Sequence, residues 1–410
     1  MFSNYIKIAL KVLKRRKFFT FISLFGICFT LVVLNVSTAL LDKIWSNDAP
    51  ESQMGKMLIS GELEVTGPKT RSNYYASLFI LHTYIKKLES ASNQSFFSSN
   101  RLITNFTHGK KLILNKRYVD ANYWQLFDFN FIEGHPFNEQ DYEKGERFAV
   151  ISEFVRDQFY PNETAEGKTI EIDKVTFRII GVVKSVSKAK DYTYSDVWIP
   201  TTSMNENFDS EYLADYRAVF LAESRDDFPA IRTEFQKKVK AIPMLDSNHD
   251  NLVFVLDTKF ETVSRDFSGD INDSAVNTYI ATIAGAAFLF MLLPAINLIN
   301  INTSRILERS SEIGVRKSFG ASSGSLVLQF IVENIILTVI GGLIAFVLTE
   351  FVLIQITSMN LIEHTSFHLN FEVFANGLLI SILFGLLSGV YPAWRMSRLN
   401  PVNALRGGQS

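Results

Sequence analysis

The chain of 410 residues is predicted to be an α-helical membrane protein with four transmembrane helices and a large mixed α+β domain between the first two. Two observations predict this class: four long apolar runs, and a single long polar segment between the first two runs. A bilayer core about 30 Å thick needs about 20 apolar residues in helical form. The runs that meet this length are residues 18–41, 278–301, 326–356 and 374–391.

The distribution of positive charge predicts the orientation of these helices. Residues 1–17 hold six Lys or Arg and no acid, the loop 302–325 holds four against two acids, and the tail 392–410 holds three and no acid. The loop 357–373 has no Lys or Arg, and segment 42–277 has 28 Lys or Arg against 36 Asp or Glu. Because cytoplasmic segments carry the excess of Lys and Arg, we expect both termini and the loop 302–325 inside, and the other two segments outside.

The N-terminus also has features of a secretory signal, since a basic segment precedes an apolar core and Ser37-Thr38-Ala39 could form a cleavage site. The apolar core of a signal runs about 7 to 15 residues, whereas this run is longer than that. We therefore interpret it as a retained anchor. The chain has one cysteine, Cys28, inside this anchor, so the external domain is predicted to build its core without a disulfide.

Local patterns predict several elements of the external domain. Residues 147–152, RFAVIS, read as a short buried strand, and Ser152 can cap a following helix that Pro161 ends. Two alternating stretches around Asp173 and Lys174 predict a β-hairpin that turns at these two residues.

A charged segment, ERSSEIGVRKSFGAS at residues 308–322, lies between the second and third apolar runs. Glu312 and Arg316 have the i, i+4 spacing and order that add a few tenths of a kcal/mol to a short helix, and Gly320 is placed to end it. The alternation of both charges suits contact with a protein better than contact with lipid. The alternative interpretation is a solvated connector between two spans.

This segment resembles the loop after the second membrane helix in the MacB/FtsX/LolC class of ABC-transporter permeases, whose pattern is about E-R-x-x-E-I-G-x-R-K-x-x-G-A. The residues at matching places are Glu308, Arg309, Glu312, Ile313, Gly314, Arg316, Lys317, Gly320 and Ala321. The resemblance continues in the tail 391–406, which departs from the family only at Met396 and Ser397. Residues 119–185 and 196–200 resemble the MacB-type periplasmic domain, whereas 49–107 and 205–259 show no such match.

The resemblance implies the membrane subunit of a MacB-like ABC transporter in a bacterial inner membrane, with its large domain in the periplasm. Two such subunits, either two copies or a pair with a paralogue, would join two separately encoded ATPases. ATP-driven closure would pull on residues 308–321, and the first two spans would relay this motion to the periplasmic domain for export or efflux. A periplasmic adaptor and an outer-membrane channel are further candidate partners, and nucleic acid is not expected.

Two other readings of the same resemblance stay open. A LolC-like permease would extract lipoproteins, whereas an FtsX-like regulator would activate a cell-wall hydrolase or serve a peptide-sensing signalling complex. The length of segment 42–277 and the match over residues 119–185 favour the MacB-like reading, because FtsX-like chains have a shorter external domain. The sequence does not identify the cargo or signal.

No motif in the chain predicts catalysis or a metal site. It has no G-x-x-x-x-G-K-[ST] loop, no dinucleotide fingerprint and no nucleophile elbow, so ATP and Mg²⁺ are expected to bind the partner ATPase and no cofactor to bind this chain. His364 and His368 beside Glu363 lack a third zinc ligand. Residues 266–277 lack the glycine and the closing glutamate of a calcium loop.

Two features stand out inside the predicted spans. Glu333 is ionisable and costs at least about 2.5 kcal/mol at full membrane depth, which makes it a candidate for structural pairing, for functional coupling or for proton handling. Gly341 with Ala345, and Gly385 with Gly389, form small-xxx-small patterns that allow close helix contact. That contact could lie within one subunit or between two.

Overall fold

The computed structural model describes residues 6–7, 11, 13–15, 17–85, 87–107, 110–203, 213–244, 248–286, 288–289, 315, 318–320 and 322–397. The chain forms two units. The helical unit comprises Met1–Ile44, Thr282–Leu361 and Ser366–Ser410, and the sheet unit comprises Trp45–Ala281 with Ile362–Thr365.

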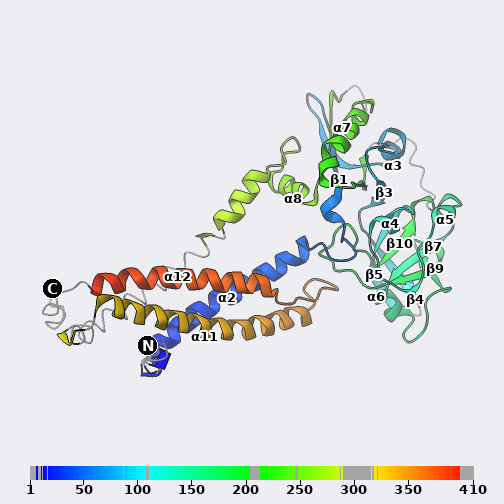
Figure 1. The fold of residues 1–410 in the computed structure, drawn as a ribbon. Helices are drawn as coiled ribbons and strands as arrows, with labels where there is room; N and C mark the ends of the chain where they lie inside the picture. The colour runs from blue at the N-terminus through cyan, green and yellow to red at the C-terminus, as the bar shows by residue number, and fades with distance from the viewer. Residues whose placement is uncertain are drawn as a thin grey trace. The chain divides into compact units, whose positions relative to one another are not determined.

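The helical unit contains three long helices, α2 (Lys17–Trp45), α11 (Ser323–Ser358) and α12 (Phe371–Ser397), which lie side by side in Figure 1. Among the described residues, Thr20–Trp45 and Val327–Ser358 are long and apolar enough to cross a membrane, and Phe371–Leu383 is a shorter apolar helix. The first and third predicted spans therefore have the helices that the sequence requires. The fourth lies within α12, and the second falls mostly outside the described residues, so the count of four spans stays a prediction.

Small residues let the helices of this unit approach one another closely. A Cβ built on Gly341 of α11 would lie 2.9 Å from Cγ2 of Ile27 in α2, and one on Gly342 would lie 2.6 Å from Cδ1 of Leu378 in α12. Ala345 is fully buried in a cluster with Ile27 and two further residues of α2. Packing of this kind between backbones suits helices in lipid, where association cannot rely on the hydrophobic effect.

The sheet unit contains a single sheet of thirteen strands among the described residues. Its strands are β1 (Met57–Thr66), β2 (Arg71–Ala76), β3 (Asn93–Ser98), β4 (Arg101–Thr107), β5 (Lys110–Val119), β6 (Phe131–Gly134), β7 (Phe148–Ser152), β8 (Thr169–Ile172), β9 (Val175–Val183), β10 (Val197–Pro200), β11 (Leu213–Ala214), β12 (Tyr216–Leu221) and β13 (Asn251–Asp257). Its helices are α3 (Leu78–Ile80), α4 (Tyr123–Leu126), α5 (Glu139–Glu143), α6 (Glu153–Phe159), α7 (Phe228–Val239) and α8 (Lys259–Ser268), with the short turns η1 (Met54–Lys56), η2 (Leu81–Ile85), η3 (Thr201–Ser203) and η4 (Arg225–Asp227).

The sheet has two halves, with the order β11-β2-β1-β12-β3 followed by β5-β10-β7-β9-β6. The first half is antiparallel and also holds β13 on β1; the second is mixed, with parallel pairs β5–β10 and β7–β9, and holds β4 and β8. One residue pair, Phe97 in β3 with Val119 in β5, joins the halves. We call this pair the seam.

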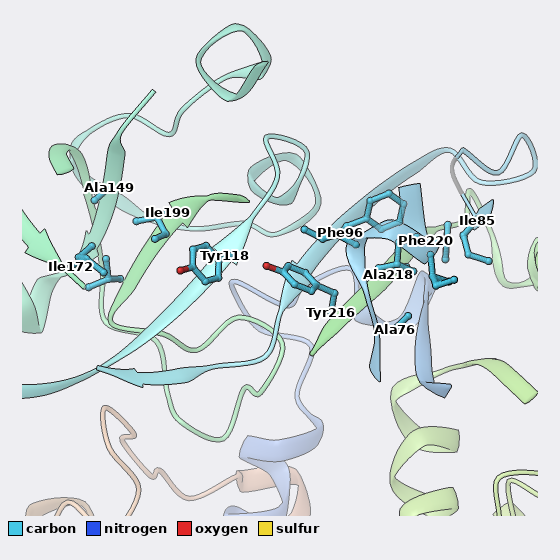
Figure 2. Packing of buried hydrophobic residues seen from close by; sticks show 14 of the residues in the cluster. Ala76, Ile85, Phe96, Tyr118, Ala149, Ile172, Ile199, Tyr216, Ala218 and Phe220 are labelled. Carbon is cyan, nitrogen blue, oxygen red and sulfur yellow. The ribbon is translucent and has the colours of Figure 1, made fainter. Parts of the chain in front are cut away.

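An apolar core runs along both halves of the sheet. Figure 2 shows Tyr118 of β5 and Tyr216 of β12 between a group that includes Ala149 and Ile199 and a group that includes Phe96. α7 covers the antiparallel half, because Phe235 on its inner face lies 6.0 Å from the ring of Phe220 and 5.1 Å from that of Phe254.

The elements that local patterns predicted are confirmed. β7 is a buried strand, the Ser152 side chain accepts from the Val155 N–H at the start of α6, and α6 ends before Pro161. Asp173 and Lys174 have φ of 50° and 65° between β8 and β9, as a tight two-residue hairpin turn requires.

Candidate functional site

Of the predicted ATPase-coupling residues, the structure describes Gly320. Its φ is 90°, and the preceding Phe319 donates its N–H to the Val315 carbonyl at 3.1 Å, so this residue has the left-handed conformation expected where a helix ends. The others lie outside the described residues: Glu308, Arg309, Glu312, Ile313, Gly314, Arg316, Lys317 and Ala321. Their role stays a prediction.

The candidates inside the membrane helices lie in α11 and α12. Glu333 of α11 has a buried side chain, 1% exposed. Gly341 and Ala345 lie against α2 of the same chain, and a contact of this small-xxx-small pattern between two subunits is untested. Gly385 and Gly389 lie within α12. The structure describes their helical backbone but not what packs against them, so their role in helix contact stays a prediction.

The best-defined polar cluster of the structure surrounds the β9–β10 loop, residues 184–196. Buried backbone carbonyls of this loop need donors, and Arg117 of β5, which is 2% exposed, donates to the Asp191 carbonyl at 2.6 Å and to the Tyr192 carbonyl at 2.8 Å. Tyr123 of α4 donates its hydroxyl to the same Tyr192 carbonyl at 2.9 Å. The middle of the loop is therefore fixed to the sheet.

Charge adds to this attachment. Arg217 of β12 forms an ion pair with Asp191 at 2.9 Å. Burial by itself raises the pKa of the Asp191 carboxyl, but the Arg217 and Arg117 guanidinium groups lower it more, and the net pKa lies below its ordinary value. Because Arg117 comes from the mixed half of the sheet and Arg217 from the antiparallel half, the loop is bound to both halves.

The loop also contacts the chain that follows α2. Lys190, 3% exposed, donates its Nζ to the Ser46 and Asp48 carbonyls, each at 3.0 Å, and pairs with the Asp48 carboxylate. Partial burial raises the pKa of Asp48, whereas the hydrogen bond and charge of Lys190 lower it, and the net pKa is below its ordinary value. Thr193 donates to Oε1 of Glu51 at 3.1 Å, and Glu51 is fully buried.

A second connection starts from α8, the helix that precedes the second predicted span. Lys259, the first residue of α8, donates Nζ to Oε2 of Glu51 at 2.8 Å. Its Nζ also lies 5.9 Å from the ring centroid of Tyr192 in the β9–β10 loop. Glu51 thus links the chain after α2, the start of α8 and, through Thr193, the loop.

The third connection is Ile362–Thr365, which lies between α11 and α12 along the chain and belongs to the sheet unit. Tyr194 donates its hydroxyl to Oε2 of Glu363 at 2.8 Å, and Lys188 donates its N–H to the Glu363 carbonyl at 3.1 Å. Ser187 and Thr365 share a hydroxyl hydrogen bond, and the His364 ring lies 5.1 Å from that of Phe154. The Tyr194 hydrogen bond, with help from Lys188, lowers the pKa of Glu363.

The contacts of this loop involve segments that follow or precede predicted spans along the chain. One loop bonds to residues next to the first predicted span and to the segment between the third and fourth spans, and through Glu51 it joins the helix before the second span. Among these contacts the Glu51–Lys259 ion pair is buried, and losing one partner of a buried pair leaves the other charge uncompensated. The structure brings together no group of three or more His, Cys, Asp or Glu that could hold a metal within its described residues.

Sequence reasoning did not identify this loop. Its signal is visible in the sequence, KSVSKAKDYTYSD at residues 184–196, where charged and aromatic residues alternate between two buried strands. The partners of these residues, however, lie 142 positions away at Asp48 and 175 positions away at Glu363. Such contacts cannot be inferred from spacing.

Comparison with known proteins assigns both units to known domains. The MacB-like periplasmic core domain matches residues 20–238, and the FtsX-like permease C-terminal domain matches residues 284–401. The first match includes segment 49–107 and part of 205–259, where sequence reasoning found no resemblance. These segments form β1 to β4, β11 to β13 and α7; they build the antiparallel half of the sheet and add β4 to the mixed half.

Curated relatives agree with the domain matches. The "Uncharacterized ABC transporter permease YknZ" of Bacillus subtilis is 27% identical over 289 residues, covering 70% of this chain and 68% of that protein. The "Macrolide export ATP-binding/permease protein MacB" of Bdellovibrio bacteriovorus is 26% identical over 366 residues, covering 86% of this chain and 52% of that protein. The crystal structure of the periplasmic region of MacB from Actinobacillus actinomycetemcomitans aligns with a TM-score of 0.40 and 15% identity, covering 56% of this chain and 99% of that one.

Long apolar helices in one unit and a large sheet in the other are the features of a membrane permease with an extramembrane domain. The chain belongs to the ABC transporter permeases of the MacB/FtsX family, with a MacB-like periplasmic core domain and an FtsX-like permease domain. Members of this family work with an ATPase, which in the MacB relatives is named as part of the same protein. The regions of this chain that match are permease domains.

Proposed function

We propose that this chain is the membrane subunit of a MacB-like transporter, in which a separately encoded ATPase drives a conformational change in the periplasm for export or efflux. The subunit acts in the bacterial inner membrane with both termini in the cytoplasm. It pairs with a second copy or a paralogue, because each chain carries one set of spans. It is not an enzyme by itself. A periplasmic adaptor and an outer-membrane channel complete the export route.

The β9–β10 loop is the observation that carries this proposal. A permease that works by transmitting force needs rigid contacts where its helices enter the periplasmic domain, and the contacts of Lys190, Glu51 and Glu363 supply them. The size of the sheet unit, Trp45–Ala281, favours the MacB-like role over the FtsX-like regulator. The ATPase acts on the cytoplasmic segment 308–321, and Glu312 supplies the charged side chain that it binds.

The test is coexpression with a separately encoded ABC ATPase from the same organism and purification of the complex. The chain alone should hydrolyse no ATP, and the complex should. Glu312→Lys should weaken co-purification about tenfold or more, since a lost charged hydrogen bond costs about 1.5 to 3 kcal/mol. Gly320→Val should do the same because a β-branched residue resists a φ of 90°.

The control is Glu143→Lys, an equal charge reversal at an exposed position of the sheet unit. This variant should keep both membrane level and co-purification. Full ATPase binding and normal export in both Glu312→Lys and Gly320→Val would contradict the proposed ATPase contact. The segment would then be a solvated connector between two spans.

A further inference from the structure

A cavity of 580 Å³ lies in the sheet unit beside the chain that follows α2, within the volume range of small-molecule sites. Its apolar lining residues are Trp45, Phe228, Phe260, Met54 and Val276. The rings of Trp45 and Phe260 lie 5.4 Å apart. The cavity therefore offers aromatic and aliphatic side chains to the apolar part of a ligand.

Three cations also line the cavity, and they differ in how they are paired. Lys259 is bound to Glu51, and Arg232 is bound to Glu261. Arg225 donates Nε to the Gly55 carbonyl at 2.8 Å and forms no ion pair with any residue that the structure describes. Arg225 is thus the cation available to an incoming anion.

Two donors converge beside Gly55. A Cβ at this position would lie 3.3 Å from Nη2 of Arg225 and 3.6 Å from Nδ2 of Asn47. Asn47, Gly55 and Arg225 all line the cavity, so both nitrogens border it at this position. A phosphate or carboxylate group bound in the cavity next to these donors would accept hydrogen bonds from them, and the bond from Arg225 would be charge-assisted.

The position of the cavity along the chain indicates the source of its ligand. Trp45 is the last residue of α2, which forms the first span, and Val276 precedes the second predicted span by two residues. Residues that flank spans lie at the membrane surface, where tryptophan is enriched. Amphiphilic molecules concentrate at that surface, with their chains in lipid and their heads in water.

From these observations we propose that the cavity binds an amphiphile with a compact anionic head, such as a phosphate or carboxylate. Arg225 and Asn47 hold the head beside Gly55, and Trp45, Phe228 and Phe260 hold the chain. This site is independent of the ATPase contact. A negative result for ligand binding would therefore leave the proposed export function untouched, and the reverse also holds. The head chemistry is shared by a bilayer phospholipid and by a free single-chain amphiphile.

The test uses the purified full chain in nanodiscs with three photoreactive diazirine probes: a fatty acid, its neutral monoacylglycerol, and a phosphatidylglycerol. Peptides that contain Trp45, Phe228 or Phe260 should be labelled by the fatty acid about tenfold more than by the neutral probe. Labelling by phosphatidylglycerol as well would identify bilayer lipid as a ligand, and labelling by the fatty acid alone would identify a free amphiphile. Equal labelling by the neutral probe, or no labelling of these peptides, would overturn the proposal.

Variants separate charge from shape. Arg225→Gln should reduce labelling by the fatty acid about tenfold. Gly55→Ala should reduce it as well without changing the charge, since the added methyl group would lie 3.3 Å from Nη2 of Arg225 and 3.6 Å from Nδ2 of Asn47 and would hinder the approach of a ligand to both donors. Arg147→Gln removes an equal charge from an exposed position of the same unit and should change nothing. Unchanged labelling in Gly55→Ala, with a wild-type unfolding temperature, would contradict the convergent-donor site even if Arg225→Gln did not fold.

Discussion

The Glu51–Lys259 pair gives a prediction whose size follows from burial. Glu51 is fully buried and Lys259 has a side chain 12% exposed, so Lys259→Met leaves a buried carboxylate whose remaining side-chain bond is to Thr193. Removing one member of a buried ion pair costs about 3 to 5 kcal/mol. For a unit of this size each kcal/mol lowers the unfolding temperature by about 2 to 4 °C, so we expect a fall of about 6 to 20 °C.

The double variant Glu51→Gln, Lys259→Met provides the comparison. It removes both charges, and the glutamine keeps an oxygen that can accept from the Thr193 hydroxyl. Its unfolding temperature should therefore recover most of the loss, because replacing a buried pair as a whole is often close to neutral. The difference between the single and double variants measures the coupling between the two residues.

The measurement is thermal unfolding of the full chain in detergent, followed by intrinsic tryptophan fluorescence. A shift below about 2 °C for Lys259→Met, or a double variant as unstable as the single one, would refute the reasoning that Glu51 depends on Lys259. A recovered unfolding temperature with reduced export would indicate, in addition, that the pair transmits force as well as stabilising the fold.

Three further outcomes are expected. In a variant without the native cysteine, a cysteine at Ser366 should react with an impermeant maleimide in spheroplasts and one at Ser322 should not; the reverse would overturn the predicted topology. Since the Tyr194 hydroxyl and a lysine lower the pKa of Glu363, this contact contributes stability above about pH 4.3 and loses it as pH falls through the lowered pKa. A spin label attached to a cysteine in place of the adjacent histidine should therefore gain mobility in acid but not between pH 5 and 8. Glu363→Gln should abolish this pH-dependent change in mobility. Gly341→Val should destabilise the helical unit by about 1 to 3 kcal/mol, since a Cβ there meets an isoleucine of α2 at 2.9 Å; unchanged resistance to heat in detergent would argue against that contact.

The mixed half of the sheet could be predicted where the signals are local. Ser152 predicts the start of a helix because its own side chain can cap it. Asp173 and Lys174 predict a turn because they lie between two stretches of alternating apolar and polar residues. The antiparallel half could not be predicted in the same way. Met57 of β1 pairs with Leu221 of β12, and a register shift between Ser60 and Leu63 breaks the alternation that would identify β1 as a strand.

The candidate site shows the same difference between local signals and contacts that join distant parts of the chain. The candidate coupling segment 308–321 could be predicted because the family pattern lies within one short stretch of the sequence. Its coupling role is still to be tested. The β9–β10 loop was missed because its importance depends on what Lys190 and Tyr194 touch, and those partners come from distant parts of the chain. Gly341 illustrates an intermediate case: its spacing from Ala345 predicted a close contact, but only the fold identified α2 as the partner.

The seam between Phe97 and Val119 makes the sheet mechanically uneven. The seam has one residue pair, whereas β12 and β3 share six, β5 and β10 share four, and β10 and β7 share two. A rotation of one half against the other would break this single backbone pairing and leave every other ladder intact. The side chains of Arg117 and Arg217, one from each half, meet at Asp191 in the β9–β10 loop. A pull on that loop would therefore act on both sides of the seam at once.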